Sequence, residues 1–306
     1  MGGAFLPWRL GAGATLEQVE GVVEQCRTAR DVRQEARALN QLALMLRAAD
    51  EREGALEAMR EAFQCCRRAD DEAGLLSCAE SWGVMHAGFG DFEVAEVRVR
   101  EAMQLAQSAG DVGALASCRR NLGLIRGRKG KLRDAVQEGL ESTALFVQAG
   151  DPQGAAMAAF GLGNILFSSG EVRQAVSVLE HCLLLRRRCK DKLGLAEALN
   201  ALGLSFAQIG YQLHAMDYFE QALALCQELG DRDGEAACLR HLGRVHHVHG
   251  DHNEAVSSLE ASLSLCLRRD NSSGQALCHR ALADVRMDLG DPRLALVHLE
   301  EALSLV

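Results

Sequence analysis

The sequence is poor in aromatic residues and in proline. Among its 306 residues, aromatics make up 4% and only three residues are proline. A sandwich or barrel of short strands is normally rich in aromatic and turn residues, so this composition disfavours both folds. No run of about 18 apolar residues is present, so we expect no helix that spans a membrane. Pro7 and Arg9 interrupt the apolar run at Phe5 and Leu6, so we expect no secretory signal.

Basic residues are also in deficit. The chain has 33 Lys and Arg residues against 42 Asp and Glu residues, which gives a formal net charge of -9. General nucleic-acid binding requires a basic surface that contacts phosphates, so the charge balance argues against that class of protein. The eleven cysteines, in a chain without a secretory signal, predict free thiols and a cytoplasmic location.

A period of 40 residues runs through the chain from Asp31 without a gap. Seven copies follow one another, the last ending at Val306. One position is alanine in every copy, and a turn position is glycine in all copies but the first. The predicted repeats are 31–70, 71–110, 111–150, 151–190, 191–230, 231–270 and 271–306. The alanine position comprises Ala55, Ala95, Ala135, Ala175, Ala215, Ala255 and Ala295. Such a period is typical of a repeat architecture.

Each copy predicts two helices. Apolar residues recur at steps of three and four, as at Leu199, Leu202 and Phe206, and the second segment ends at a Gly-Asp pair such as Gly230-Asp231. A glycine inside a helix, such as Gly163, costs roughly 1 kcal/mol relative to alanine, and a closely crossing helix explains its presence. We therefore predict an all-α fold, a right-handed α-solenoid of stacked antiparallel helix pairs. Residues 15–30 predict an N-terminal capping helix, and residues 1–14 a weakly ordered tail.

These positions resemble the tetratricopeptide repeat over residues 31–306. Leu202-Gly203 in the first helix and Ala215, Phe219 and Ala222 in the second match the family pattern. The usual repeat has about 34 residues, whereas this one has 40 with a Gly-Asp linker. The longer variant, and the Gly-Leu-Gly-Asn sequence at 161–164, are similar to the Pins/LGN family of polarity adaptors and to rapsyn-type scaffolds. The resemblance implies an adaptor that binds extended partner peptides along a concave groove.

The resemblance also implies which residues line that groove, namely first-helix residues that do not pack inside the repeat. Two rows vary from copy to copy, as expected of a binding surface. The fourth repeat adds an apolar stripe that could anchor a peptide or pack against the next repeat. Arginines that flank the stripe could bind carboxylates or remain solvated. The candidate groove residues are Arg120, Met157, Phe160, Asn164, Phe167, Asn200, Leu204, Arg240, Arg244 and Arg280.

Other clusters have simpler explanations. Five histidines crowd the sixth repeat, but no zinc-binding motif accompanies them, so we expect a solvated helix end and no metal site. Cys78, Cys118, Cys238 and Cys278 share a position with alanines and are expected to be buried. Two basic runs, at 119–133 and 186–192, are typical of solvated faces, with acidic proteins or RNA as the alternatives. No nucleophile–base pair or phosphate-binding loop is present, so we expect neither an enzyme nor a cofactor.

The sequence thus predicts a non-enzymatic scaffold that binds an extended peptide with apolar and acidic residues. Two alternatives remain. One is a structural assembly protein that self-associates through the C-terminal edge, where Leu303 and Leu305 lie. The other is an RNA-binding solenoid, which the negative net charge disfavours.

Overall fold

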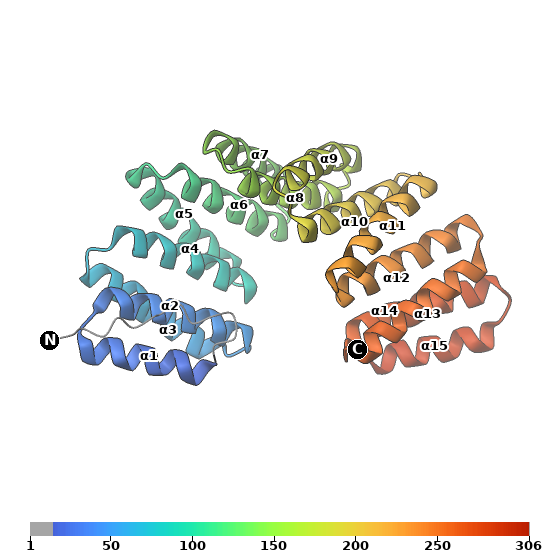
Figure 1. Cartoon of the computed structure of the whole chain (residues 1–306), viewed down its shortest axis with the longest axis horizontal. Helices are drawn as coiled ribbons and strands as arrows, with labels where there is room; N and C mark the ends of the chain where they lie inside the picture. The colour runs from blue at the N-terminus through green and yellow to red at the C-terminus, as the bar shows by residue number, and fades with distance from the viewer. Residues whose placement is uncertain (1–14, 306) are drawn as a thin grey trace. The chain divides into compact units, whose positions relative to one another are not determined.

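The structure, a computed structural model, describes residues 15–305 (Figure 1). This part of the chain contains fifteen α-helices and no strand, which confirms the predicted all-α repeat solenoid. The predicted N-terminal tail, residues 1–14, lies outside the described residues.

Helix α1 (Leu16–Ala29) precedes seven helix pairs. The first helices of the pairs are α2 (Val32–Ala48), α4 (Glu72–Gly88), α6 (Val112–Arg128), α8 (Pro152–Ser168), α10 (Lys192–Gln208), α12 (Arg232–His249) and α14 (Ser272–Asp288). The second helices are α3 (Arg52–Arg68), α5 (Phe92–Ala109), α7 (Leu132–Gln148), α9 (Val172–Arg188), α11 (Gln212–Leu229), α13 (His252–Arg268) and α15 (Pro292–Ser304).

The contacts divide the chain into two units, Met1–Gly154 and Ala155–Val306. In the first unit α2 packs on α3, α4 on α5, and α6 on α7. In the second unit α10 packs on α11, α12 on α13, and α14 on α15. The first helices α10, α12 and α14 also contact one another in sequence, so they form a continuous surface. We call the exposed side chains of α8, α10, α12 and α14, within the second unit, the first-helix face.

The helices begin where the sequence supplies a cap. The side chain of Asp231 accepts a hydrogen bond from the backbone N–H of Gly234 at 3.1 Å, and six equivalent Asp or Asn residues cap their helices in the same way. Thr15 and Gln18 form a capping box that starts α1. Gly210 ends a first helix with φ of 91°, a conformation that glycine adopts without the penalty of a Cβ atom.

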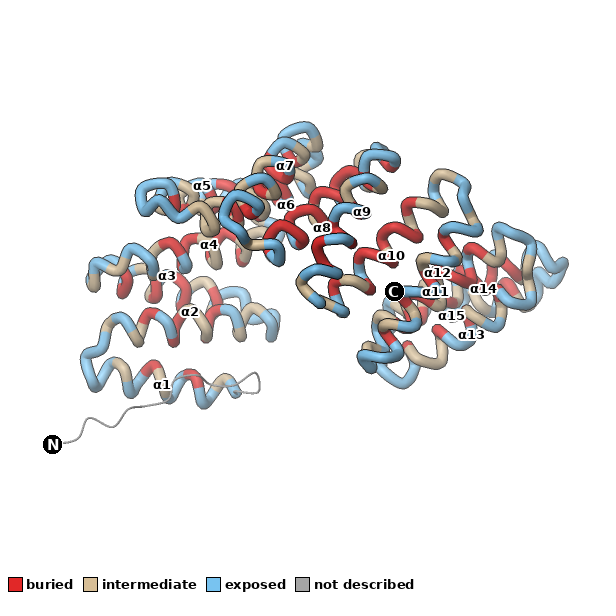
Figure 2. Tube along the Cα trace, turned by 45° about the horizontal axis from the view of Figure 1, so that its top comes forward, coloured by how far each residue is buried: buried red, intermediate tan, exposed pale blue. Residues whose placement is uncertain are grey.

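Buried residues lie on every helix of the described part (Figure 2), and they form core clusters between the two helices of a pair and between successive pairs. Ala215 and Ala255 are fully buried. A Cβ atom added to Gly203 would lie 2.6 Å from the ring of Phe219, so the glycine makes room for an aromatic side chain on the facing helix. The small positions of the repeat therefore set how closely the helices of a pair approach.

Candidate functional site

A pocket of about 500 Å³ opens among the first helices of the second unit. Three predicted groove residues line it together, namely Phe167 of α8, Leu204 of α10 and Arg244 of α12. Their side chains are half-buried or exposed, and Val245 and Val248 of α12 extend the apolar lining. The repeat register explains this convergence, because the three residues lie near the ends of neighbouring first helices.

Two stacked rings contribute to the pocket. Phe219 is fully buried, and the His241 ring lies against it with centroids 5.3 Å apart and an interplanar angle of 18°. Burial lowers the pKa of His241 to about 3, and the positive charges of Arg240 and Arg244 act in the same direction. The imidazole is therefore neutral at neutral pH and acts as a flat, largely apolar surface.

Polar groups also line the pocket. Gln208, Gln212 and Asp284 contribute to it beside Arg244. The Oε1 atom of Gln212 is buried and has no hydrogen-bond partner among the described residues. A buried acceptor without a partner costs roughly 1–3 kcal/mol, so a ligand that donates a hydrogen bond here would recover that cost.

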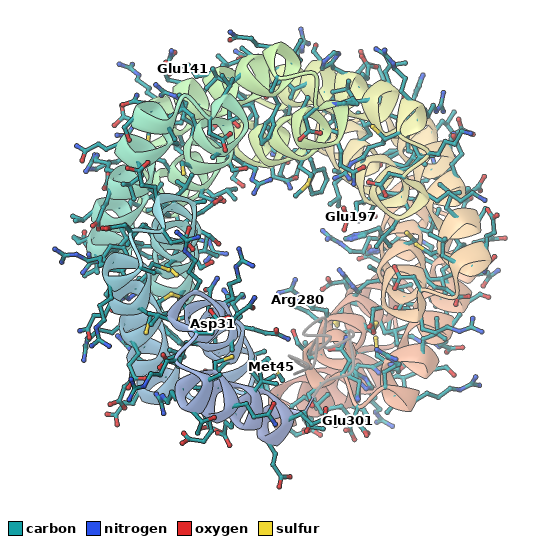
Figure 3. The ribbon with its side chains drawn as sticks, turned by 60° about the vertical axis from the view of Figure 1, so that its left-hand side comes forward. Asp31, Met45, Glu141, Glu197, Arg280 and Glu301 are labelled. Atoms are coloured by element: carbon teal, nitrogen blue, oxygen red, sulfur yellow. The ribbon has the colours of Figure 1, made fainter. Side chains whose placement is uncertain are left out.

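Three arginines lie close together on α12 and α14. Burial lowers the pKa of Arg240, and the nearby charges of Arg244 and Arg280 lower it further. Within residues 15–305, none of the three makes an ion pair with a carboxylate. Figure 3 labels Arg280, whose side chain extends from the first-helix face, as does that of Glu197. The group of Arg240, Arg244 and Arg280 is thus a concentration of positive charge in which no arginine pairs with a carboxylate of the described residues.

The remaining predicted residues of the second unit lie outside the pocket lining. On α8, Met157 is 40% exposed, Asn164 is exposed and Phe160 is half-buried. Asn200 lies on α10, where its Oδ1 atom is 4.0 Å from the sulfur of Cys238. The choice between anchoring and packing for Phe160 therefore stays a prediction.

Arg120 belongs to the first unit, on α6. Its charge acts on the half-buried Glu80, whose pKa is raised by burial and lowered in part by Arg120. Glu80 also accepts a hydrogen bond from Asn121 at 2.9 Å. Arg120 therefore has an electrostatic role within its own unit.

The first basic run is a solvated face only in part, which corrects the sequence-based interpretation: Arg128, Lys131 and Arg133 are exposed, but three other residues form ion pairs. Arg126 lies between two buried carboxylates, 3.3 Å from Glu96 on α5 and 2.8 Å from Glu138 on α7. Lys129 pairs with Glu96 at 3.0 Å and Arg119 with Glu138 at 2.8 Å. Three basic residues of the run are thus neutralised inside the first unit. The hydrogen bonds of Glu96 to Lys129 and Arg126 hold its pKa low against the opposing effect of burial.

The second basic run is exposed as predicted except at Arg186, and one of the histidines also departs from the prediction. Arg186 is buried and pairs with Asp191. His241 is buried rather than part of a solvated helix end, whereas His247 pairs with Asp288 at 2.8 Å. Within the described part of the chain, no group of three or more His, Cys, Asp or Glu side chains is placed to hold a metal ion.

The predicted burial of the cysteines is confirmed. Cys78, Cys118, Cys238 and Cys278 are at most 2% exposed, and all eleven cysteines are free thiols. No described helix is both long and apolar enough to cross a membrane.

Sequence reasoning missed part of the pocket lining. Phe219 was assigned to packing, and His241 was grouped with the other histidines of its repeat. No pattern in the sequence pointed to Gln212 as a pocket residue. The position of His241 in the repeat was informative, because its equivalents include Ala201 and Ala281, which are buried residues of the first helix.

Comparison with family models identifies the repeat. A tetratricopeptide repeat model matches residues 154–228, 215–268 and 235–306, which together make up half of the chain. A second tetratricopeptide repeat model matches residues 36–69, and a model of anaphase-promoting complex subunit 5 matches residues 81–127. No curated protein matches the sequence.

Solved structures share the fold at low sequence identity. BtubC from P. vanneervenii is 22% identical, with a TM-score of 0.60 over 69% of this chain and 88% of that one. The apo form of RapI is 13% identical, with a TM-score of 0.68 over 89% of this chain and 97% of its own. The Rap conjugation gene regulator of the plasmid pLS20, in complex with the Phr* peptide, is 13% identical, with a TM-score of 0.63 over 91% of this chain and 75% of that protein.

Proposed function

Because the chain belongs to the tetratricopeptide repeat family, we propose that it is a protein-interaction scaffold that binds an extended peptide on its first-helix face. The peptide carries apolar and acidic residues. Family membership supports the scaffold class in general, and the family is generally non-catalytic. One observation carries the more specific proposal: an apolar pocket and a group of unneutralised arginines occur on the same face.

The pocket suits an apolar side chain of the peptide. Phe167, Leu204 and Val245 provide apolar contacts, and the neutral His241 ring adds a flat surface. Burial of one apolar side chain contributes about 1.5–3 kcal/mol. A backbone N–H of the peptide can donate a hydrogen bond to Oε1 of Gln212, which has no partner among the described residues.

The arginine group suits an acidic residue of the peptide. Arg244 belongs both to the pocket lining and to the arginine group, so the apolar and acidic contacts fall side by side. Arginine binds carboxylates by forked, charge-assisted hydrogen bonds worth about 1.5–3 kcal/mol each. The Rap regulator that shares the fold was solved with a peptide, which supports a peptide as the ligand class.

The test starts from a phage-displayed library of random peptides, selected against the full chain. We expect the enriched peptides to combine apolar residues with Asp or Glu. Synthetic versions should lose about tenfold or more in affinity for Arg244→Glu and for Phe167→Ala, because each change removes a central contact. Isothermal titration calorimetry measures the affinities.

Arg188→Glu is the matched control, because it makes the same charge change on an exposed residue of α9, a second helix. The control should bind the peptides with unchanged affinity. Circular dichroism must show that each variant is folded. Peptides that bind Arg244→Glu, Phe167→Ala and the wild type equally would contradict the proposed site.

A second candidate function is self-association, which exposed leucines of the last helix pair favour. Leu277, Leu299 and Leu303 line a cavity of about 760 Å³, and Leu303 is 78% exposed. Light scattering over a concentration series tests this candidate. Concentration-dependent association that Leu303→Glu abolishes would support it, and a strict monomer at every concentration would remove it.

RNA binding loses support from the same structure, because buried glutamates neutralise Arg126 and Lys129 in the first basic run. Eleven free thiols favour a reducing compartment, so a cytoplasmic location is part of the proposal.

A further inference from the structure

Two cysteines meet where the first repeat joins the second. Cys66 lies on α3 and Cys78 on α4, and their sulfur atoms are 3.8 Å apart. Gly74 makes this approach possible, because a Cβ atom there would lie 2.7 Å from the sulfur of Cys66. A disulfide requires about 2.05 Å between the sulfurs, so they would need to approach by a further ~1.8 Å.

A cavity lies beside the two cysteines. It measures about 220 Å³, and Cys66, Cys78, Arg37 and Asp71 are among the residues that line it. Liquid water occupies ~30 Å³ per molecule, and hydrogen peroxide, with two oxygen atoms, needs about twice that volume. The thiols themselves are at most 2% exposed, so a bulky reagent cannot approach them as a peroxide can.

The two thiols differ in acidity. The hydrogen bond between the two thiols lowers the pKa of the Cys66 thiol. Burial and the charge of Asp71 oppose this effect, and the positive charge of Arg37 adds to the lowering. The same hydrogen bond, together with burial, raises the pKa of Cys78. Cys66 is therefore the more acidic sulfur of the pair, and Cys78 is the sulfur that keeps its proton.

The same two repeat positions hold cysteines at two other junctions, which provide internal comparisons. These pairs are Cys226 with Cys238 and Cys266 with Cys278. Burial raises the pKa of Cys226, and it raises the pKa of Cys238 to about 12. Neither member of the Cys226 pair is thus a thiolate at neutral pH, although the fold places the two in equivalent positions.

We propose that Cys66 and Cys78 are a peroxide-reactive dithiol whose oxidation joins the first repeat to the second by a disulfide. The Cys66 thiolate attacks one oxygen of hydrogen peroxide, which breaks the O–O bond and leaves a sulfenic acid and hydroxide. The Cys78 thiol gives its proton to that hydroxide, and its sulfur attacks the sulfur of Cys66. The S–O bond breaks and hydroxide leaves as water once it takes up a proton. Two thiols and one peroxide thus give one disulfide and two waters.

The test uses the full, reduced chain treated with hydrogen peroxide at neutral pH and then with iodoacetamide. A digest should contain one cross-linked peptide that joins Cys66 to Cys78 and is two hydrogen atoms lighter than its two reduced component peptides together. This cross-link should form roughly tenfold or more faster than one between Cys226 and Cys238, because the rate follows the thiolate fraction.

Two variants separate the two roles. Ala106 occupies the position of Cys66 in another repeat, so Cys66→Ala suits the fold, and Cys78→Ser keeps a hydroxyl that can donate a hydrogen bond to Cys66. In Cys78→Ser, peroxide should add one oxygen atom to Cys66 as the sulfenic acid, seen by mass spectrometry of a digest, whereas Cys66→Ala should leave Cys78 unoxidised. Cys226→Ala is the matched control and should cross-link Cys66 to Cys78 at the wild-type rate.

Two results would overturn the proposal. One is a folded wild-type chain in which peroxide leaves Cys66 and Cys78 reduced. The other is equal oxidation rates at Cys66–Cys78 and Cys226–Cys238. Both are read on the wild-type protein, so neither depends on how well a variant folds.

Discussion

The imidazole of His241 lies almost parallel to the ring of Phe219, with an interplanar angle of 18° and 5.3 Å between the ring centroids. The first ring comes from α12 and the second from α11, so the stack joins consecutive repeats. The stack excludes water from His241, which is 9% exposed. A charged imidazole would lose its hydration there, and Arg240 and Arg244 would repel it.

The first prediction follows from the low pKa of His241, which is about 3 in the folded protein against an ordinary value of 6.5. Below pH 6.5 the unfolded chain takes up a proton that the folded chain does not, so stability falls as the pH falls from about 6.5 towards about 3. The slope for one proton is about 1.4 kcal/mol per pH unit. Urea unfolding at a series of pH values measures it.

His241→Asn is the control, because Asn121 occupies the same position in the third repeat. The variant should lose this part of the pH dependence. Both tyrosines, Tyr211 and Tyr218, lie in the second unit, and both tryptophans lie in residues 1–154, so the two signals report on different units. If the unfolding free energy of His241→Asn, followed by the tyrosine signal, depended on pH as steeply as that of the wild type, the prediction would be wrong.

The second prediction compares two glycines inside helices. A Cβ atom on Gly243 would lie 2.6 Å from Leu259 and 3.0 Å from the carbonyl oxygen of Ala255, whereas one on Gly21 would meet nothing within 4 Å. Gly21→Ala should therefore stabilise the protein by roughly 0.5–1 kcal/mol through helix propensity. Gly243→Ala should destabilise it by about 1–3 kcal/mol, because overpacking outweighs that gain. Thermal unfolding followed by circular dichroism should give opposite shifts, and a stabilised Gly243→Ala would contradict the proposed close crossing.

The sequence allowed the fold to be predicted because packing in a repeat is itself periodic. Gly203 and Ala215 recur at fixed positions, and each marks a contact between the two helices of one pair. The ion pairs of Glu96 and the stacking of His241 occur once each, and they join residues of different helices. Their partners depend on three-dimensional neighbours, so a pattern along the chain contains no signal for them. Arg240 and Arg244 were predicted as groove residues because they depart from the repeat at positions that the packing pattern does not use.

The third prediction concerns Glu138, which binds two arginines in the first unit. Its carboxylate is 2.8 Å from Arg119 and 2.8 Å from Arg126, and its side chain is 9% exposed. Glu138→Ala leaves part-buried guanidinium groups without this partner and should destabilise the first unit by about 3 kcal/mol. Tryptophan fluorescence during urea unfolding measures the change.

A matched control for Glu138 is the exposed pair of Lys192 and Glu228, in which each side chain is 55% exposed. Glu228→Ala should change stability by at most about 0.5 kcal/mol, since water screens such a pair. If Glu138→Ala and Glu228→Ala lowered the stability by the same small amount, the buried ion pairs of Glu138 would not stabilise the fold.

The fourth prediction is that the arginine group lowers the stability of the folded protein. Arg240 is half-buried, lies near Arg244 and Arg280, and makes no ion pair with a carboxylate among the described residues. Asn200 occupies the same position one repeat earlier, so Arg240→Asn keeps a residue that the repeat accepts. The variant should be more stable by about 0.5–1 kcal/mol, because it removes both desolvation and repulsion between like charges.

Peptides selected as above should bind Arg240→Asn more weakly, since binding is the role that accounts for an uncompensated charge. Added salt should narrow the stability gap between the two proteins, because screening weakens the repulsion only in the wild type. A variant that is less stable than the wild type at every salt concentration would show that Arg240 stabilises the fold and was wrongly assigned to binding.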